Sequence, residues 1–294
     1  MPRHGNLKNR LVKEIKSKDN PLYKKLVALQ SAAYARKNQL ITVEGLRHTL
    51  DVLQSGHKPE YIFFCEDEKG AEACRQITVS LEEKGENLAD MRFVRLSAPL
   101  FYRASVQKTP QGVIALVAYR MGQLEPFLES LGSEADASRL LILEAIQDPG
   151  NVGTLIRTAD AFSLDGVILT DSCASVWNPK TVAASMGSLF HIPIIEGAGG
   201  VRPALNLLKQ TGFEILAAGL EGEDLAARSS FNPRLALMLG NEGSGLSAVA
   251  LEEADRVLHI PMTGRAESLN VASAGAILLW ELAGRRREGG SAMA

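Results

Sequence analysis

A glycine-rich turn with an embedded carboxylate follows one of the apolar segments of the chain. In "LALMLGNEGSGLS" the glycines Gly240, Gly243 and Gly245 surround Asn241 and Glu242. Glycines at a strand end let the backbone approach a ligand closely, and such turns usually hold phosphate. Glu242 would repel a phosphate, and the spacing G-x-x-G-x-G reverses the dinucleotide fingerprint, with no Walker lysine after it. The turn therefore suits a ligand that is not a phosphate chain, or a tight turn without a ligand.

Two other loops combine amides, an arginine and helix-capping residues. In "QDPGNVGTLIRTADAF", Asn151 is placed to cap a helix, and Arg157 lies just off the apolar stripe of that helix. In "HIPMTGRAESLNVASAGAILLWELAG", Ser268 or Glu267 is placed to cap a long apolar helix, and Asn270 falls in its first turn. Asparagine is a poor helix residue, so we expect its amide to be used. Taken alone, each segment is also explained as an ordinary capped helix.

The three loops follow strands of one expected parallel sheet. Near-continuous apolar segments alternate with amphipathic helices from residue 139 onward, which is the pattern of a parallel sheet covered on both faces. The expected strands are "LLILEAI", "GVILT", "FEILAAG", "LALMLG" and "VLHIPM". Ligands of such sheets bind at the carboxyl ends of the strands, which is where the loops begin.

A smaller α/β unit is expected before this sheet. Its strands are "LITVEG", "PEYIFFCED", "MRFVRLS" and "QGVIALVAY", with helices between them, the first helix being capped by Asn20. The polar stretch after it is interpreted as a connector or a helix with a loose tail. The predicted organisation is 1–120 for the first unit, 121–138 for the linker, 139–286 for the second unit and 287–294 for a disordered tail.

The charge of the chain is unevenly distributed. The formal net charge of the 294 residues is only −2, yet residues 1–50 hold eleven Lys or Arg against three acids, which gives +8 there and −10 in the remainder. A basic arm on an acidic body indicates a polyanionic partner, most often nucleic acid. A solvated, lysine-rich helix face explains the same composition equally well.

Several classes of protein are disfavoured by composition. The three cysteines Cys65, Cys74 and Cys173 and the five histidines have no disulfide or metal-ligand spacing, so no structural metal is expected. No window approaches the roughly 18 apolar residues of a membrane helix. The N-terminus lacks the apolar core of a secretory signal. We therefore expect a cytoplasmic protein that does not contact a membrane.

The combination of loops is more specific than any one of them. N-x-G-x-x-x-R, L-G-N-E-G-x-G-L and I-P-M-x-G-x-x-x-S-L-N-V occur in this order within residues 139–285. Together they resemble the three motifs of the SpoU/TrmH family of RNA ribose 2′-O-methyltransferases, in the SPOUT class. "NPLYKKLVAL" and "TVEGLRHTLDVL" resemble the small, ribosomal-protein-like α/β substrate-binding domain of the ribosomal-RNA branch. The fold implied is α/β: a C-terminal parallel-sheet domain with a deep trefoil knot, and a smaller N-terminal α/β domain.

The resemblance implies S-adenosylmethionine as the cofactor, held in a bent shape by loops of the knot. A sulfonium donor would also explain why a carboxylate is tolerated in the glycine turn. The cofactor-binding residues expected from the motif match, with backbone contacts dominating, are Gly240, Asn241, Gly245, Ile260, Met262, Ser268 and Leu269.

The same resemblance implies catalytic roles for Arg157, Asn151, Glu242, Ser268 and Asn270. Arg157 matches the family's essential arginine, sometimes assigned as the base. Because guanidinium normally stays protonated in proteins, binding phosphate and stabilising a developing 2′-alkoxide is the role we favour. Glu242 is expected to orient Arg157 or the substrate and is a second candidate proton acceptor. Asn151, Ser268 and Asn270 are expected to position ribose, phosphate or the motif loops. Family members are homodimers that take Arg157 from one subunit and the cofactor from the other.

The resulting hypothesis is 2′-O-methylation of a structured RNA, with ribosomal RNA favoured by the N-terminal unit. Three alternatives stay open: a transfer-RNA substrate, a non-catalytic RNA-binding or ribosome-assembly factor, and a nucleotide-dependent oxidoreductase. The oxidoreductase is suggested only by glycine turns and α/β alternation, and it lacks the forward fingerprint.

Overall fold

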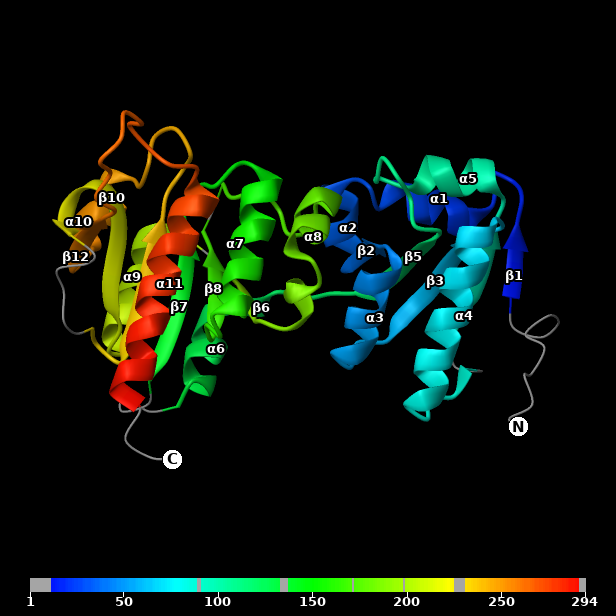
Figure 1. Ribbon diagram of the computed structural model, residues 1–294, viewed down its shortest axis with the longest axis horizontal. Helices are drawn as coiled ribbons and strands as arrows, with labels where there is room; N and C mark the ends of the chain where they lie inside the picture. Colours follow the sequence, from blue (N-terminus) through cyan, green and yellow to red (C-terminus); the bar gives the residue numbers. More distant parts are fainter. Residues whose placement is uncertain are drawn as a thin grey trace. The chain divides into compact units, whose positions relative to one another are not determined.

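The chain divides into two compact units (Figure 1). The computed structural model describes residues 12–88, 91–132, 137–170, 172–197, 199–224 and 231–290. The first unit comprises Met1–Arg120 together with Val176–Ala183, and the second comprises Met121–Ser175 together with Ala184–Ala294. The first unit therefore includes a short segment that lies in the second half of the sequence.

The described part of the first unit is built on a five-stranded sheet in the order β1-β4-β3-β5-β2. Strands β1, β4 and β3 are parallel, and β5 runs antiparallel to both β3 and β2. The strands are β1 (Val12–Ile15), β2 (Leu40–Glu44), β3 (Pro59–Cys65), β4 (Phe93–Leu96) and β5 (Val113–Ala118). The helices are α1 (Pro21–Ala28), α2 (Ala32–Asn38), α3 (Leu46–Gln54), α4 (Glu68–Glu83) and α5 (Ala98–Ala104).

The alternation of side chains in β3 explains how this unit is layered. Ile62 and Phe64 lie in one apolar cluster with residues of α3 and α4, such as Leu53 and Ile77. Helices α3 and α4 therefore cover one face of the sheet, because successive strand residues point to opposite faces. The predicted cap of α1 is confirmed: the Asn20 side chain accepts hydrogen bonds from the backbone N–H groups of the first turn.

The second unit contains a parallel sheet, as predicted, with the order β12-β10-β11-β7-β8-β9-β6 across seven described strands. The strands are β6 (Gly122–Gln123), β7 (Ser138–Leu143), β8 (Gly166–Leu169), β9 (Ile194–Glu196), β10 (Glu214–Asp224), β11 (Arg234–Leu239) and β12 (Arg256–His259). The helices are α6 (Leu124–Ser130), α7 (Pro149–Ala161), α8 (Pro179–Ser185), η2 (Ser188–Phe190, a 3₁₀ turn), α9 (Val201–Gln210), α10 (Ala248–Glu253) and α11 (Val271–Gly290). Of these, α8 falls largely in the segment that belongs to the first unit.

Helices cover both faces of this sheet. Residues of α6, α9 and α10 share an apolar cluster with Leu140, Ile142 and Met238 of the strands. Helices α7 and α11 lie side by side on the opposite face (Figure 1). Their packing is close, because a Cβ at Gly275 of α11 would lie 2.5 Å from Leu155 Cδ2 of α7.

The stretch expected as a linker, 121–138, contains regular structure in its described part. Gly122 and Gln123 form the edge strand β6, and α6 follows at once. Leu124, Phe127 and Leu128 are buried in the core of the second unit. Of the two alternatives that the sequence left open for this stretch, the helix is therefore confirmed for Leu124–Ser130. At the other end, the predicted tail begins inside α11, which continues to Gly290; residues 291–294 lie outside the described residues.

Strand register brings the motif loops to one edge of the sheet. Leu239 of β11 pairs with Leu143 of β7, so these two strands end together. On the other side of β11, Ala217 of β10 pairs with Met238, and Ala218 pairs with Leu258 of β12. The loops after β7, β10, β11 and β12 therefore begin at the same carboxyl-terminal edge.

Candidate active site

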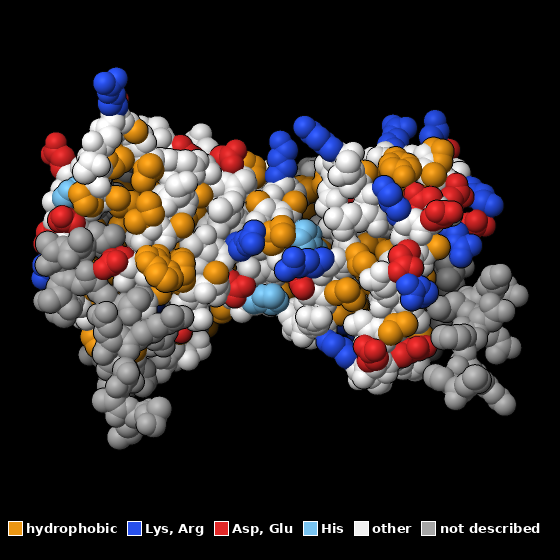
Figure 2. Space-filling view, viewed as in Figure 1, with side chains coloured by type: hydrophobic (Ala, Val, Ile, Leu, Met, Phe, Trp, Pro, Cys, Tyr) orange, Lys and Arg blue, Asp and Glu red, His pale blue; other side chains and the backbone are white. Residues whose placement is uncertain are grey.

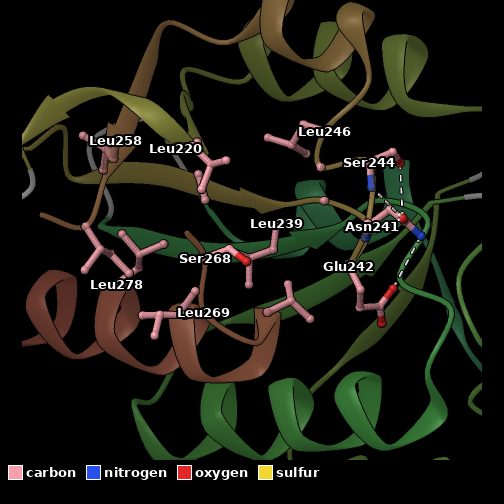
Figure 3. A pocket seen from close by; sticks show the side chains of 18 of the residues that line it. Leu220, Leu239, Asn241, Glu242, Ser244, Leu246, Leu258, Ser268, Leu269 and Leu278 are labelled. Carbon is pink, nitrogen blue, oxygen red and sulfur yellow. Dashed lines mark hydrogen bonds between the residues drawn. The ribbon is translucent and has the colours of Figure 1, made fainter. Parts of the chain in front are cut away.

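A cavity of about 430 Å³ opens at this edge of the second unit (Figure 3). Its walls are the bulged part of β10, the loops after β11 and β12 and the first turns of α11. Leu220 and Leu258 face Leu269 and Leu278 across it. Small-molecule and cofactor sites have volumes of roughly 300–1,000 Å³, so the cavity has the size of a cofactor site.

The structure gathers all the residues expected to bind the cofactor around this one cavity. They come from two loops, and α10 and β12 lie between these loops in the sequence. The residues are Gly240, Asn241, Gly245, Ile260, Met262, Ser268 and Leu269. Met262, Ser268 and Leu269 are exposed at its mouth, whereas Gly240 lies at its base. These seven residues therefore line one contiguous cavity, and their binding of a cofactor stays a prediction.

The lining of the cavity is apolar and nearly free of charge. Among the described residues that line it, Glu242 is the only ionisable one, and most others are Leu, Ile, Val, Ala or Gly. A phosphate chain would find no cation there, which argues against a nucleotide-dependent oxidoreductase. An adenosine joined to a positively charged sulfonium fits this lining, because the ligand is largely apolar and carries its own positive charge.

The glycine turn has a shape that only glycine permits at two positions. The backbone N–H groups of Asn241 and Gly245 each donate to the other residue's carbonyl, both at 2.9 Å, which closes the turn. A Cβ at Gly240 would lie 2.3 Å from Gly245 C and from Leu246 N, which backbone atoms cannot accommodate. Gly245 has a φ of +71°, a left-handed value that favours glycine.

Asn241 shapes the turn with its side chain. Its Oδ1 accepts from the backbone N–H groups of Gly243 (2.9 Å) and Ser244 (3.1 Å), and its Nδ2 donates to the Ala145 carbonyl at 2.8 Å. Its own backbone is paired with Gly245. All its polar groups are thus engaged within the protein, so its effect on a ligand is through the form of the turn.

Glu242 connects the turn to the start of α7. Its Oε1 accepts from Asp148 N (3.1 Å) and Asn151 Nδ2 (3.0 Å), and its Oε2 accepts from Gln147 N (3.2 Å) and Asn241 Nδ2 (3.4 Å). Burial alone would raise the pKa of this carboxyl, but the hydrogen bonds from Asn151, Gln147 and Asp148 outweigh burial and lower it. The carboxylate is therefore ionised at neutral pH and is a weak proton acceptor.

Asn151 does not cap α7, contrary to the prediction. The cap is Asp148, whose carboxylate accepts from the Asn151 backbone N–H at 2.9 Å. Pro149 occupies the first turn, as is common for proline. The Asn151 side chain is left free to bridge two loops: it donates to Glu242 and accepts from Asn270 Nδ2 at 3.2 Å.

Asn270 is the cap of α11, whereas Ser268 or Glu267 was expected there. Its Oδ1 accepts from the backbone N–H groups of Ala272 (2.9 Å) and Ser273 (3.3 Å). The expectation that its amide would be used is confirmed, but Asn270 precedes the helix, which begins at Val271, and does not lie in its first turn. Ser268 is exposed at the mouth of the cavity.

Arg157 lies apart from this network. It is exposed on α7 and makes no hydrogen bond or ion pair with the described residues. It follows Asn151 by six positions, so it lies about 9 Å further along the helix and about 120° around it. Within one chain, the described structure brings together Asn151, Glu242 and Asn270 and leaves Arg157 outside the cavity lining.

Sequence reasoning missed one part of the site and one buried carboxylate outside the cavity lining. Residues 218–220, at a bulge of β10, line the cavity, and Leu220 is 72% exposed. The glycines of "AAGLEGED" were the available signal, because a Cβ at Gly222 would lie 2.3 Å from the Val257 carbonyl oxygen. Glu144 was also missed: it is buried at the end of β7 and accepts from the N–H and hydroxyl of Ser247, the cap of α10.

Comparison with protein families and relatives decides the family. Residues 138–280 match the SpoU rRNA Methylase family, and residues 20–115 match the MRM3-like substrate binding domain. Over 193 residues, the chain is 38% identical to the 23S rRNA (guanosine(2553)-2′-O)-methyltransferase RlmP of Bacillus subtilis, an alignment that covers 64% of this chain and 71% of the relative. The chain belongs to the SpoU methylase family.

Solved structures of the family share the fold over nearly the whole chain. An AdoMet-bound rRNA methyltransferase from Sinorhizobium meliloti is 27% identical, with a TM-score of 0.76 and coverage of 94% of this chain and 98% of that one. A putative TrmH-family RNA methyltransferase from Porphyromonas gingivalis is 30% identical, with a TM-score of 0.72 and coverage of 90% and 97%. This SpoU-family chain is an RNA methyltransferase, and S-adenosylmethionine is its expected cofactor.

Proposed function

We propose that this protein transfers a methyl group from S-adenosylmethionine to a ribose 2′-hydroxyl of ribosomal RNA. The observation that carries the proposal is the cavity at the carboxyl edge of the parallel sheet, where the turn 240–245 and the loop 260–269 meet. Its apolar lining and its single carboxylate suit this cofactor, and the family and the B. subtilis relative supply the reaction class.

The residues of the chain hold the cofactor mainly through backbone atoms. Gly240, Ile260 and Leu269 line the cavity, and their amide and carbonyl groups are proposed to contact the cofactor. When bound, the cofactor supplies an electrophilic methyl group on a positively charged sulfur. Fixing the line between that methyl and a ribose hydroxyl supplies several kcal/mol of the barrier, because reacting groups held in line avoid an entropic cost.

Glu242, Asn151 and Asn270 act in this proposal as positioning residues. The turn that lines the cavity, the start of α7 and the start of α11 meet in their hydrogen bonds. The role of proton acceptor considered for Glu242 from the sequence is disfavoured, since its lowered pKa makes it a weak base. Ser268, exposed at the mouth of the cavity, is proposed to contact the substrate ribose or phosphate.

Arg157 is proposed to bind the RNA phosphate and to stabilise charge that develops on the 2′-oxygen. Because it does not line the cavity of its own chain, we propose that it completes the cavity of a second copy. Exposed apolar side chains on α11 support a homodimer: Ile277 is 42% and Trp280 61% exposed, and the Trp280 ring lies 6.0 Å from that of Phe162. Figure 2 shows hydrophobic side chains gathered over α11 and the loops beside its N-terminal end. Such clusters usually mark interfaces.

The knot implied by the family resemblance is also part of the proposal. Strand β11 lies between β10 and β7, and the loop after β12 returns to the cavity beside α7 before α11 begins. This arrangement is compatible with a chain end that threads through an earlier loop. No metal is proposed, and among the described residues no group of three His, Cys, Asp or Glu side chains is arranged to hold one.

Ribosomal RNA is proposed over transfer RNA because of the first unit, which matches a substrate-binding domain along residues 20–115. Staphylococcus aureus relatives that are 32% identical carry the name "Putative TrmH family tRNA/rRNA methyltransferase", so transfer RNA is an outcome that the test must separate. No helix among the described residues is long and apolar enough to span a bilayer. We propose a cytoplasmic location, where a bacterial enzyme would meet its RNA.

The test is transfer of labelled methyl from S-adenosylmethionine to purified RNA. Ribosomal RNA and transfer RNA are offered separately, and the product is digested with alkali, to which a 2′-O-methylated linkage is resistant. Label in alkali-resistant dinucleotides of ribosomal RNA is the expected result. Label in bases, or label only in transfer RNA, would overturn the substrate assignment, and absence of transfer with tight RNA binding would favour a non-catalytic assembly factor.

A further inference from the structure

A groove of about 340 Å³ in the first unit lies between α1 and α5, segments about 80 residues apart in sequence. It is lined by Lys18, Asp19, Tyr23, Lys24, Val27, Ala28 and Arg103. Lys18 lies in the turn before α1, and Arg103 lies in the last turn of α5. The groove is separate from the cofactor cavity, and the proposed reaction does not account for it.

The rim of this groove carries uncompensated positive charge. Of its three cations, Lys24 forms an ion pair with Asp19 at 3.2 Å, and both of these side chains are more than half exposed. Lys18 and Arg103 form no ion pair with any residue in the described part of the chain. Exposed pairs are strongly screened, so Asp19 neutralises only part of the charge. Figure 2 shows Lys and Arg side chains over α5.

The floor of the groove is apolar. Tyr23 is buried, and its hydroxyl donates to the Leu100 carbonyl of α5 at 3.1 Å. A second bond joins the turn after α1 to α5, from Gln30 Nε2 to the Ala104 carbonyl at 2.9 Å. Val27 and Ala28 are half-buried beside Tyr23. These two hydrogen bonds connect the segment 23–30 to α5 beside the groove.

We propose that this groove holds the sugar–phosphate backbone of the RNA substrate, with phosphates against Lys18 and Arg103 and a ribose over the Tyr23–Ala28 floor. This rests on the proposed function and adds the surface by which the first unit grips RNA. Cations on a rim suit a chain of phosphates, and the small apolar floor suits a sugar. A bilayer surface is disfavoured, since no lining residue is a large exposed apolar side chain.

The test compares two double variants of the full chain that remove the same charge. Lys18→Ala with Arg103→Ala removes the two rim cations. Lys69→Ala with Arg75→Ala removes two cations from α4, the helix that packs on the sheet face of Ile62 and Phe64. Binding of a labelled RNA hairpin is measured across a range of salt concentrations, with cofactor affinity measured by calorimetry on the same samples.

The rim variant is expected to lower RNA affinity about 25- to 60-fold at 0.1 M salt relative to 1 M salt, because each lost phosphate contact removes a salt slope of roughly 0.7 to 0.9 log units per tenfold change in salt. The slope of log affinity against log salt should fall by about 1.4 to 1.8, whereas the α4 variant should keep its slope. Cofactor affinity should not change in either variant. Lys18→Arg with Arg103→Lys retains both charges and should bind RNA nearly as the parent does, which separates charge from folding.

Equal losses of RNA affinity in the rim and α4 variants would overturn the proposal that the groove binds RNA, because such losses would reflect net charge alone. An unchanged salt slope in the rim variant would overturn it as well, as would loss of binding to an acidic peptide or anionic vesicles with RNA binding intact. The proposed function fails differently. Suppose that the parent chain binds the hairpin through the rim cations yet transfers no methyl to any RNA. This result would refute the proposed activity and would still support RNA binding in the groove.

Discussion

Replacing Glu242 by glutamine tests whether this carboxylate positions loops or takes a proton. The substitution keeps the shape of the side chain and removes its charge. In the parent, one carboxylate oxygen accepts from Asp148 N and Asn151 Nδ2, and the other accepts from Gln147 N and Asn241 Nδ2. A glutamine offers one acceptor oxygen and one NH₂ group, so one of these pairs of donors loses its partner.

The size of the effect follows from those two lost hydrogen bonds. Each contributes roughly 0.5–1 kcal/mol at an exposed site, so the turn and the start of α7 should be destabilised by about 1–2 kcal/mol. A change of this size lowers the ratio of formed to unformed site by a factor of roughly 5–30. We therefore expect kcat to fall, by at most that factor. Glu252→Gln, at an exposed ion pair with Arg202, is the matched control and should stay within about 0.5 kcal/mol of the parent.

The contribution of Glu242 to stability should depend on pH, and the direction follows from its pKa. The pKa of Glu242 lies below its ordinary value of 4.5 in the folded chain, so the folded state favours the ionised carboxylate. The stability it contributes is complete above the unfolded pKa and is lost as the pH falls through the lower folded pKa. The gap between parent and glutamine variant in urea unfolding should therefore be full at pH 7 and should close below about pH 4.5.

The refuting result is kinetic. If methyl transfer by the parent rose with pH through an ionisation near neutrality, and Glu242→Gln abolished that rise along with activity, Glu242 would be the proton acceptor. The positioning role also fails if the variant keeps full kcat and full stability. Cofactor affinity is measured by calorimetry beside kcat. A loss of cofactor affinity would show that the cavity face of the turn is disturbed, and a loss of kcat alone would point to its contact with α7.

Three further substitutions probe the rest of the site. Arg157→Ala should lower kcat by about 10²–10³-fold while cofactor affinity stays within a few-fold, since Arg157 does not line the cavity; full activity would remove it from the mechanism. Gly240→Ala should abolish cofactor binding measured by calorimetry, because its Cβ would lie 2.3 Å from backbone, whereas Gly243→Ala, whose Cβ meets only Asn241 Oδ1 at 3.6 Å, should bind normally. Trp280→Glu should shift sedimentation from dimer to monomer without unfolding the chain, and Val79→Glu, at a 42% exposed position on α4, should leave sedimentation unchanged.

The sequence was sufficient to predict which loops line the cavity because strand ends and glycine turns are local features. Apolar segments such as "LALMLG" gave the parallel sheet, and parallel strands place their following loops at one edge. The positions of Gly240 and Ile260 around one cavity follow from that geometry. The family motifs then supplied the ligand, which periodicity alone does not specify.

What the sequence did not predict depends on contacts between distant residues. Both Asp148 and Asn151 are good caps, and the choice between them is made by Glu242, about ninety residues away, which engages the Asn151 amide. Asn270 likewise caps α11 while its amide reaches Asn151. The short strands β6 and β9 have too few residues to give a periodic signal and exist because neighbouring strands supply partners.

The segment Val176–Ala183 belongs to the first unit although most of that unit ends at Arg120. Within it, the buried Trp177 lies edge-on to the ring of Tyr119, with 5.4 Å between the ring centres. A polypeptide cut after Arg120 would leave that aromatic ring without its neighbour. As the chain emerges from the ribosome, the amino-terminal unit cannot complete its packing until more than fifty additional residues have been synthesised, so its maturation must overlap with that of the methyltransferase half.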